Sequence, residues 1–457
     1  MNHIDRSHVA SHLLLFVLLL ALVSTASAEW KEKVLYSFQG GTNDGASPAG
    51  GVVFDEAGNL YGATTDGGGE CPPAQCGIVF QLAPPARKGN PWTETVLHVF
   101  KGNASGDGNT PAGSVIMDSA GNLYGTTGYG GTGNCVLLGT KVGCGTVYEL
   151  SPPKQKGGAW KETVLYSFPT AKEGYLPNGN LVSDSAGNLY GATMFGGGYG
   201  TTCNAFYQYC GAVFELSPPT KKGGKWTEKV IHSFRGPDDG ANPNGGLVFD
   251  GAGAIYGTTY SGGYDCPHNS GQGCGTAFKL APLTKKGGTW TETVLHRFYR
   301  KVSDGGGPAA GLVFDSRGNI YGTTMGGGGG NFGSGTVFQL MPRSNGTWAE
   351  KVLYTFQDNR DGGQPQSSVV FDSGGNLYGT ASDGGTVGNG TVFRLRPGAG
   401  GSWAFAALYE FAAAPDSAYP TGPIVVRAGS LYGTTQRGGS GQACGNYGCG
   451  TVFGVNP

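Results

Sequence analysis

Charged residues are scarce in this 457-residue sequence. They fill 13% of the positions, and 30 lysines and arginines almost balance 31 aspartates and glutamates. A nucleic-acid-binding surface needs a clustered excess of basic residues, so this composition argues against a nucleic-acid partner. Histidine is also rare, with seven residues, and the sequence has no Gly-x-Ser-x-Gly elbow and no phosphate-binding loop between a strand and a helix. These absences favour a non-enzymatic protein.

Long apolar runs are limited to one, Leu13 to Val23. This run is too short to span a bilayer as a mature helix. It follows Arg6 and precedes the cleavage pattern Ala26-Ser27-Ala28. We therefore predict that residues 1–28 are a signal peptide and that the mature chain begins at Glu29. We expect a secreted monomer, outside the cell or in the periplasm, with no membrane span after cleavage.

A repeated motif organises the rest of the chain. Its clearest copy is Gly-Leu-Val-Phe-Asp-x-x-Gly-Asn-Ile-Tyr-Gly-Thr-Thr at 311–324. The Leu/Ile-Tyr-Gly core recurs about every 60 residues, at Tyr61, Tyr124, Tyr190, Tyr256, Tyr321, Tyr378 and Tyr432. A period of this size indicates a repeat architecture, so the 88 glycines mark recurring turns and not disorder.

Each unit contains four short predicted strands. In the fourth unit these are strand A at Gly246–Asp250, strand B at Ile255–Thr259, strand C at Gly275–Leu280 and strand D at Trp290–Phe298. Four antiparallel strands in each of seven units predict an all-β fold, a seven-bladed β-propeller. A β-solenoid is the alternative, but about 60 residues per unit is long for one of its turns.

The last strand of each unit alternates in character. In strand D of the fourth unit, Glu292 and His296 fall on one side, and Thr293, Leu295 and Arg297 fall on the other. This period of two indicates a half-exposed strand, and its charges suit the outer edge of a sheet.

The ends of the chain should complete one blade together. Trp30 to Phe38 is a strand D without A, B or C before it, and the chain ends on a strand C at Gly450–Val455. We predict that these two segments pair and close the ring. The predicted single domain, 29–457, has blades at 48–100, 111–168, 177–234, 243–298, 308–356, 365–411, and 420–457 with 30–38.

These repeats resemble a known family. Pro-x-Gly-Leu-Val-Phe-Asp-x-x-Gly-Asn-Leu-Tyr-Gly-Thr-Thr, followed by Gly-Thr-Val-Phe-x-Leu, is similar to the GloVer-type tandem repeat of exported bacterial "choice-of-anchor" proteins. The A–B hairpins also resemble NHL-type propeller repeats. The resemblance covers essentially the whole chain after residue 28 and implies an exported repeat protein of unknown activity.

Ten cysteines form five close pairs, each between strands B and C of one unit. The pairs are Cys71/Cys76, Cys135/Cys144, Cys203/Cys210, Cys266/Cys274 and Cys444/Cys449. One pair per loop in an exported chain predicts five local disulfides. A zinc site is the alternative, but these spacings, without accompanying histidines, suit zinc poorly.

Acidic residues occur four positions before a proline in all seven D–A loops. They are Asp44, Asp107, Glu173, Asp239, Asp304, Asp361 and Asp416. Seven carboxylates on one face could bind calcium or sugar hydroxyls. The alternative is an acid–Gly turn that recurs because the turn recurs. We favour the turn and expect no cofactor, with calcium as the alternative.

Aromatic residues outside the repeat pattern gather in the B–C loops. They are Tyr129, Phe195, Tyr199, Phe206, Tyr207, Tyr264, Phe332 and Tyr447. Exposed aromatics are common in sugar- and protein-binding surfaces. The candidate binding residues are therefore the seven acids with Tyr129, Phe195, Phe206, Tyr207 and Tyr264. The sequence favours a binding or scaffold propeller for a glycan, a peptide or an envelope protein. A propeller lyase, lactonase or glycosidase acting at the channel mouth is the alternative.

The cysteine pattern gives a covalent prediction. Mass mapping of the non-reduced protein should find five disulfides, each within one B–C loop, and no free thiol, because both members of every pair fall in the same loop. Pairing between loops, or a metal held by these cysteines, would contradict it.

Overall fold

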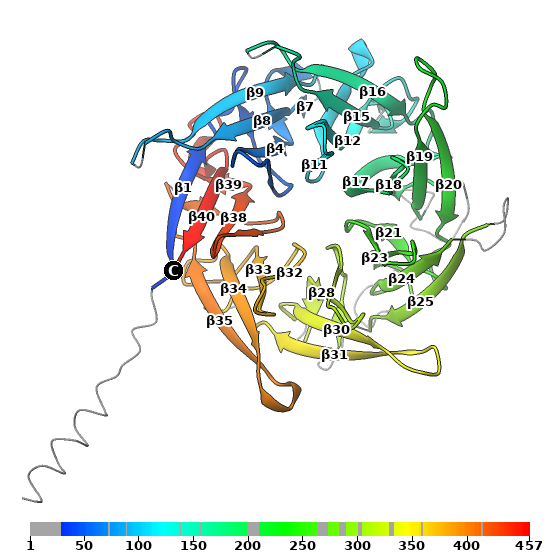
Figure 1. Cartoon of the computed structure of the whole chain (residues 1–457), viewed down its shortest axis with the longest axis vertical. Coiled ribbons are helices and arrows are strands. Elements are labelled where there is room, and N and C mark those ends of the chain that lie inside the picture. Colours follow the sequence, from blue (N-terminus) through cyan, green and yellow to red (C-terminus); the bar gives the residue numbers. More distant parts are fainter. Residues whose placement is uncertain are drawn as a thin grey trace, which may run out of the picture.

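The structure is a computed structural model. It describes residues 29–71, 74–87, 89–137, 139–155, 157–198, 210–263, 273–282, 289–299, 304–328, 333–357, 360–412 and 415–457. Seven antiparallel sheets surround a central axis (Figure 1), which confirms the predicted seven-bladed β-propeller. The predicted signal peptide lies outside the described residues. Within the described part of the chain, no helix has the length and apolar character needed to cross a membrane.

Each blade has its four strands in the order A to D from the axis outwards. Blades 1 to 4 are β3 (Val53–Phe54), β4 (Leu60–Thr64), β8 (Ile78–Ala83), β9 (Thr93–Val99); β11 (Ile116–Met117), β12 (Leu123–Gly130), β15 (Thr146–Ser151), β16 (Lys161–Ser167); β17 (Tyr175–Ser183), β18 (Leu189–Phe195), β19 (Ala212–Ser217), β20 (Thr227–Ser233); and β22 (Val248–Phe249), β23 (Ile255–Ser261), β24 (Thr276–Ala281), β25 (Thr291–Arg297). Blades 5 to 7 are β27 (Val313–Phe314), β28 (Ile320–Thr324), β30 (Thr336–Pro342), β31 (Trp348–Thr355); β32 (Val370–Phe371), β33 (Leu377–Ala381), β34 (Thr391–Pro397), β35 (Trp403–Glu410); and β37 (Val425–Arg427), β38 (Ser430–Thr435), β40 (Thr451–Asn456), β1 (Lys31–Ser37).

Short strands extend several blades by pairing the D–A loop with the end of strand B or the start of the B–C loop. They are β2 (Gly45–Ala46) with β5 (Asp66–Gly67), β10 (Gly108–Pro111) with β12, β21 (Ala241–Pro243) with β23, β26 (Gly305–Gly306) with β29 (Gly326–Gly327), and β36 (Ser417–Ala418) with β39 (Arg437–Gly438). The D–A and B–C loops therefore share one face of the ring, which we call the loop face.

Small elements decorate the loops between strands. They are the hairpins β6 (Glu70–Cys71) with β7 (Ala74–Gln75) and β13 (Val136–Leu137) with β14 (Thr140–Lys141), and the 3-10 turns η1 (Asn103–Ser105), η2 (Ala399–Gly401) and η3 (Gly445–Tyr447).

Aromatic rings fill the spaces between blades. The Phe that follows strand D of one blade contacts the strand-C ring of the next blade, with ring centroids 5.1–5.3 Å apart. That strand-C ring also lies across the glycine of Tyr-Gly-Thr in its own blade. A Cβ on Gly62 would come within 2.6 Å of Phe80, so this glycine is required by packing.

Neighbouring blades are also joined by a backbone hydrogen bond that we call the junction bond. The residue before the D–A proline donates its N–H to the carbonyl of the residue before the strand-C glycine in the preceding blade. The seven bonds, 2.7–3.3 Å long, are Ser47 to Cys449, Thr110 to Cys76, Leu176 to Cys144, Asn242 to Cys210, Gly307 to Cys274, Gln364 to Ser334 and Tyr419 to Asn389. All seven donor residues have positive φ, between 50° and 65°, although six of them are not glycine.

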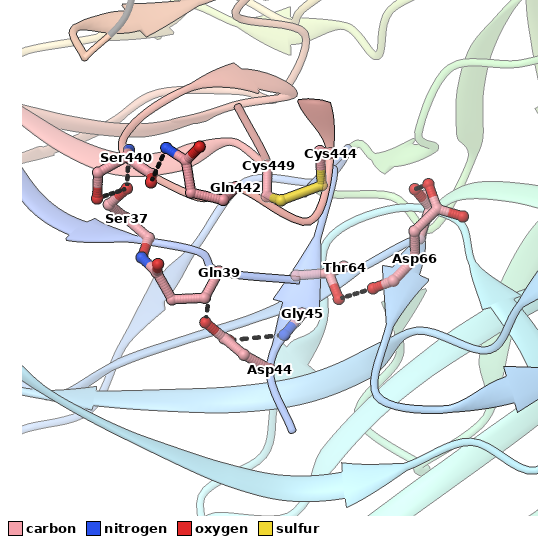
Figure 2. The surroundings of a disulfide bond; sticks show 11 residues. Ser37, Gln39, Asp44, Gly45, Thr64, Asp66, Ser440, Gln442, Cys444 and Cys449 are labelled. Carbon is pink, nitrogen blue, oxygen red and sulfur yellow. Dashed lines mark hydrogen bonds between the residues drawn. A yellow bond between two sulfur atoms is a disulfide. The ribbon is translucent and has the colours of Figure 1, made fainter. Parts of the chain in front are cut away.

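The two ends of the chain meet in blade 7. Strand β1 pairs antiparallel with β40, from Lys31 opposite Asn456 to Ser37 opposite Thr451, which confirms the predicted closure. Figure 2 shows the neighbouring loop, where the Ser440 amide donates to the Ser37 hydroxyl at 2.6 Å.

The predicted strict alternation of strand D is wrong at one position. Opposite Ala277 and Phe278, the register of β25 slips past Leu295, which forms a β-bulge. A strict period of two groups Leu295 with Thr293 on one side of the strand, but Thr293 is exposed whereas Leu295 is only 7% exposed. The bulge allows the sheet to bury one more apolar residue than a regular strand would.

The closure predicts a large effect of N-terminal truncation. Deleting residues 29–40 removes the buried side chains of Leu35 and Phe38 and leaves β40 as an open edge. Each fully buried large side chain contributes roughly 1.5–3 kcal/mol, so calorimetry should show a clearly lower melting temperature, and light scattering should show association. Removing the exposed Pro457 is the control and should change neither. A truncated protein that stays monomeric and melts normally would contradict the closure.

Candidate functional site

Five of the seven acids of the D–A loops are buried inside their loops, and Glu173 and Asp416 are half-buried. At Asp44, Oδ2 accepts a hydrogen bond from the Tyr36 hydroxyl at 3.0 Å. Figure 2 shows two further contacts, in which the Gln39 amide donates to Oδ2 at 2.7 Å and the Gly45 amide donates to Oδ1 at 2.6 Å. Asp44 is only 7% exposed. Backbone amides that precede the acid in the loop also donate to Asp107, Asp239, Asp304, Asp361 and Asp416. Glu173 instead accepts from the Thr170 hydroxyl. These contacts are those of a turn, and a binding role for the acids stays a prediction.

A tyrosine or histidine on the preceding outer strand faces most of these acids. Tyr36 donates to Asp44, whereas the Nε2 of His98 lies 3.1 Å from Asp107. His98 packs edge-on against Phe100 with centroids 4.8 Å apart, as Tyr36 does against Phe38. His98 therefore occupies the packing position that Tyr36 takes at the junction between blades 7 and 1.

A glutamate from the outer strand of the next blade completes the polar cluster at each junction but one. The glutamates at these six junctions are Glu32, Glu94, Glu162, Glu228, Glu292 and Glu350. In five of them, Glu94 to Glu350, Oε1 is buried without a hydrogen-bond partner among the described residues. Burial is the main cause that raises the pKa of these five to about 7, and a neighbouring acid adds to it. The sequence pattern placed Glu292 at a solvated outer edge; in the ring, the neighbouring blade covers its carboxylate.

The junction between blades 5 and 6 has an aromatic residue in place of the glutamate. Phe405 stacks on Tyr354 with centroids 3.9 Å apart and planes 8° from parallel. The acid there, Asp361, keeps its hydrogen bond from Tyr354 at 2.7 Å. An apolar residue can therefore replace the glutamate without loss of the junction, which indicates that the glutamate position is open to change.

A cavity on the axis is the feature in which the blades differ most. It has a volume of about 250 Å³ and is lined by residues of all seven blades, most of them between strands D and A and, in blade 3, on β17. At the position after the D–A proline, the lining residues are Ala49, Ala112, Asn178, Asn244, Ala309, Gln366 and Thr421. None of the cavity's described lining residues has an ionisable side chain. The sequence analysis missed this site, although the change from alanine to amide or hydroxyl at one repeat position marks it.

Amide and hydroxyl side chains give the cavity its hydrogen-bonding groups. Asn178 donates to the Asn244 side chain, and Asn180 accepts from the Ser114 amide at 2.7 Å. The buried Thr421 Oγ1 has no hydrogen-bond partner among the described residues, and the side chains of Asn180 and Asn244 also line the cavity. The cavity can therefore both donate to and accept from a polar ligand.

Aromatic residues lie farther from the axis on the loop face. Tyr129 and Phe195 both contact Tyr175, with centroids 6.1 and 6.0 Å apart, and all three are half-buried. Tyr447 is 67% exposed and stacks on Arg437. Tyr199, Phe206, Tyr207, Tyr264 and Phe332 lie outside the described residues. The structure thus groups two of the five aromatic candidates, and their binding role stays a prediction.

Disulfides stiffen the same face. Cys135–Cys144 and Cys444–Cys449 are formed within single B–C loops, as predicted. Figure 2 shows the second beside Ser37 and Gln39 of the N-terminal segment. Cys76, Cys210 and Cys274 are also disulfide-bonded. Their predicted partners, Cys71, Cys203 and Cys266, have side chains outside the described residues, so those three pairings stay predictions.

The closing junction gives a pH prediction. Burial first, and the neighbouring Asp416 second, raise the pKa of Glu32 to about 9, while that of Asp416 is lowered. Between pH 4.5 and 9, Glu32 therefore keeps its proton in the folded protein. In the unfolded chain it loses the proton above pH 4.5, the ordinary pKa of a glutamate. Glu32's contribution to stability should fall as the pH rises from 4.5 towards 9.

In the Glu32→Gln variant, the side-chain amide can still donate a hydrogen bond to Asp416, but the side chain no longer titrates. The variant should melt above the parent protein at pH 8 and close to it at pH 4.5, in calorimetric scans. Lys33→Gln, at an exposed position on the same strand, is the control and should leave the pH profile unchanged. Equal differences at both pH values would contradict the shared proton.

The comparisons with known proteins agree with the repeat pattern. The sequence matches the Gloeobacter/Verrucomicrobia repeat over residues 22–264, 138–328 and 266–457. No curated protein matches it significantly. A solved structure named a "putative gluconolactonase" is 14% identical and covers 68% of this chain and 80% of its own, with a TM-score of 0.34. A likeness this low carries no argument about function. The match to the repeat extends over nearly all of the sequence, and the chain therefore belongs to the Gloeobacter/Verrucomicrobia repeat family.

Proposed function

We propose that this protein is an exported, non-enzymatic binding propeller that holds an uncharged, hydroxyl-rich ligand, one end of a glycan chain, in the axial cavity. The observation that carries the proposal is the cavity lining, which consists of amides, hydroxyls, glycine, alanine and proline. Sugar hydroxyls both donate and accept hydrogen bonds, and so do the side chains of Asn180, Asn244 and Thr421.

The chemistry of the lining favours a neutral ligand. A charged side chain of the opposite sign gives the strongest hydrogen bonds to an anionic or a cationic ligand. The described lining residues offer neither kind of charge. They also offer no general acid or base, and the seven D–A acids are occupied within their own turns, so binding fits the site better than catalysis.

The size of the cavity fits the end of a chain better than a whole oligosaccharide. Sites that enclose a drug-sized ligand have volumes of roughly 300–1,000 Å³, above the 250 Å³ found here. The rest of the glycan would then lie over the loop face, where Tyr129, Tyr175 and Phe195 gather. Aromatic rings stack on the apolar faces of sugars, which supports this extension.

Export is supported by two features. The N-terminal sequence has the form of a signal peptide, and disulfides form and persist in oxidising compartments outside the cytosol. A glycan of the cell envelope would be accessible to a protein in that location.

A glycan array probed with the untagged protein, with and without a chelator, tests the proposal. We expect binding to neutral glycans that does not depend on calcium. The double variant Asn178→Ala, Asn244→Ala should weaken the binding about tenfold, because each neutral hydrogen bond contributes roughly 0.5–1.5 kcal/mol.

We expect this double variant to fold, because the repeat already tolerates alanine at this position. Alanine already occupies the equivalent position in three blades, as Ala49, Ala112 and Ala309. Ser373→Ala, in an exposed turn between strands A and B on the opposite face, is the control. Failure to bind any neutral glycan, or undiminished binding by the double variant, would reject the proposal.

A further inference from the structure

We propose that His98, Asp107 and Glu162 form a binding site for one divalent transition-metal ion of the zinc class at the junction between blades 1 and 2. Each residue offers one ligand atom, and the three atoms lie within 4.8 Å of one another. They come from the end of β9, from the D–A loop and from β16. An ion bound here would join two neighbouring blades through side chains.

The positions of the three groups suit a metal site. His98 Nε2 lies 3.1 Å from Asp107 Oδ2, and the Lys101 and Gly108 amides hold that carboxylate in place at 3.0 and 2.6 Å. Glu162 Oε1 is buried and has no hydrogen-bond partner in the described structure. Zinc binds nitrogen and oxygen ligands at about 2.0–2.2 Å, which puts the ligand atoms of a tetrahedral site about 3.3–3.6 Å apart. Small side-chain rotations would therefore close the site, and water would fill the fourth position.

The charges of the cluster also call for a cation. Two carboxylates come together in a largely buried place, and each repels the other unless a positive charge lies between them. A divalent ion balances both at once and gives Glu162 Oε1 the partner that it lacks. One imidazole and two carboxylates suit zinc and related first-row metals, whereas calcium prefers oxygen ligands alone.

The other junctions of the ring show why the site is specific to this one. Tyrosine takes the place of histidine at Tyr36, Tyr354 and Tyr409, and there the phenol donates its proton to the acid. His232 and His296 also face acids, but among the described residues only the His98 group brings three ligand atoms so close together.

Titration of the untagged, metal-free protein with Zn²⁺ tests the inference. Calorimetry should show a site with a dissociation constant in the micromolar range or below, and saturation should raise the melting temperature. Co²⁺ should compete for the site and give the visible absorption of a four-coordinate ion, while millimolar Ca²⁺ should not displace either metal.

Two variants separate the metal site from a structural role. His98→Tyr copies the residue of other junctions, so we expect it to melt like the parent protein in a chelator, yet to lose one equivalent of Zn²⁺ with at least a tenfold drop in affinity. Glu162→Gln preserves the side-chain shape and should weaken Zn²⁺ as well. His296→Tyr is the matched control and should leave Zn²⁺ binding unchanged. The inference is overturned if neither Zn²⁺ nor Co²⁺ binds, or if both metals bind as tightly to His98→Tyr and Glu162→Gln as to the parent protein.

Discussion

The ring depends on the close approach of backbones at the junction between blades. The residue before each D–A proline must present its N–H to the preceding blade, and it takes a left-handed conformation to do so, at about 1–2 kcal/mol for a residue with a Cβ. The glycine on the other side has no room for a side chain: a Cβ on Gly450 would lie 2.4 Å from the Thr435 carbonyl and 2.6 Å from Pro48. The glycine that follows each acceptor residue recurs because a side chain there would block the junction.

The most repetitive residues of the sequence serve this architecture. The first threonine of Tyr-Gly-Thr-Thr reaches the next blade in several units, as Thr434 does to the Gly50 carbonyl at 2.6 Å. The second threonine joins strands B and C, as Thr435 does to Thr451 at 2.8 Å. The residues that line the axial cavity, in contrast, differ from blade to blade. An asymmetric ligand can be recognised only where the sevenfold pattern is broken.

The junction clusters show how a buried polar feature can vary within a fixed frame. The acid is always satisfied by its own turn, so the strand residue facing it can be tyrosine or histidine, and the glutamate from the next blade can be replaced by Phe405. Half-burial keeps the pKa of most of these glutamates near 7. Each junction can therefore acquire its own titration or ligand chemistry while the aromatic pairs beside it hold the blades together.

The sequence by itself determined the number of blades, the strand order, the closure by residues 30–38 and the placement of cysteines in B–C loops. The repeat period, the turn residues and the strands at the two chain ends can all be recognised in the sequence without knowledge of tertiary contacts. The tertiary structure alone decided where Glu292 and Leu295 point, because a neighbouring blade and a β-bulge cover them. It also decided that Asn178, Asn244, Gln366 and Thr421 meet on the axis. These residues are far apart in the sequence, and only the closure of the ring brings them to one cavity.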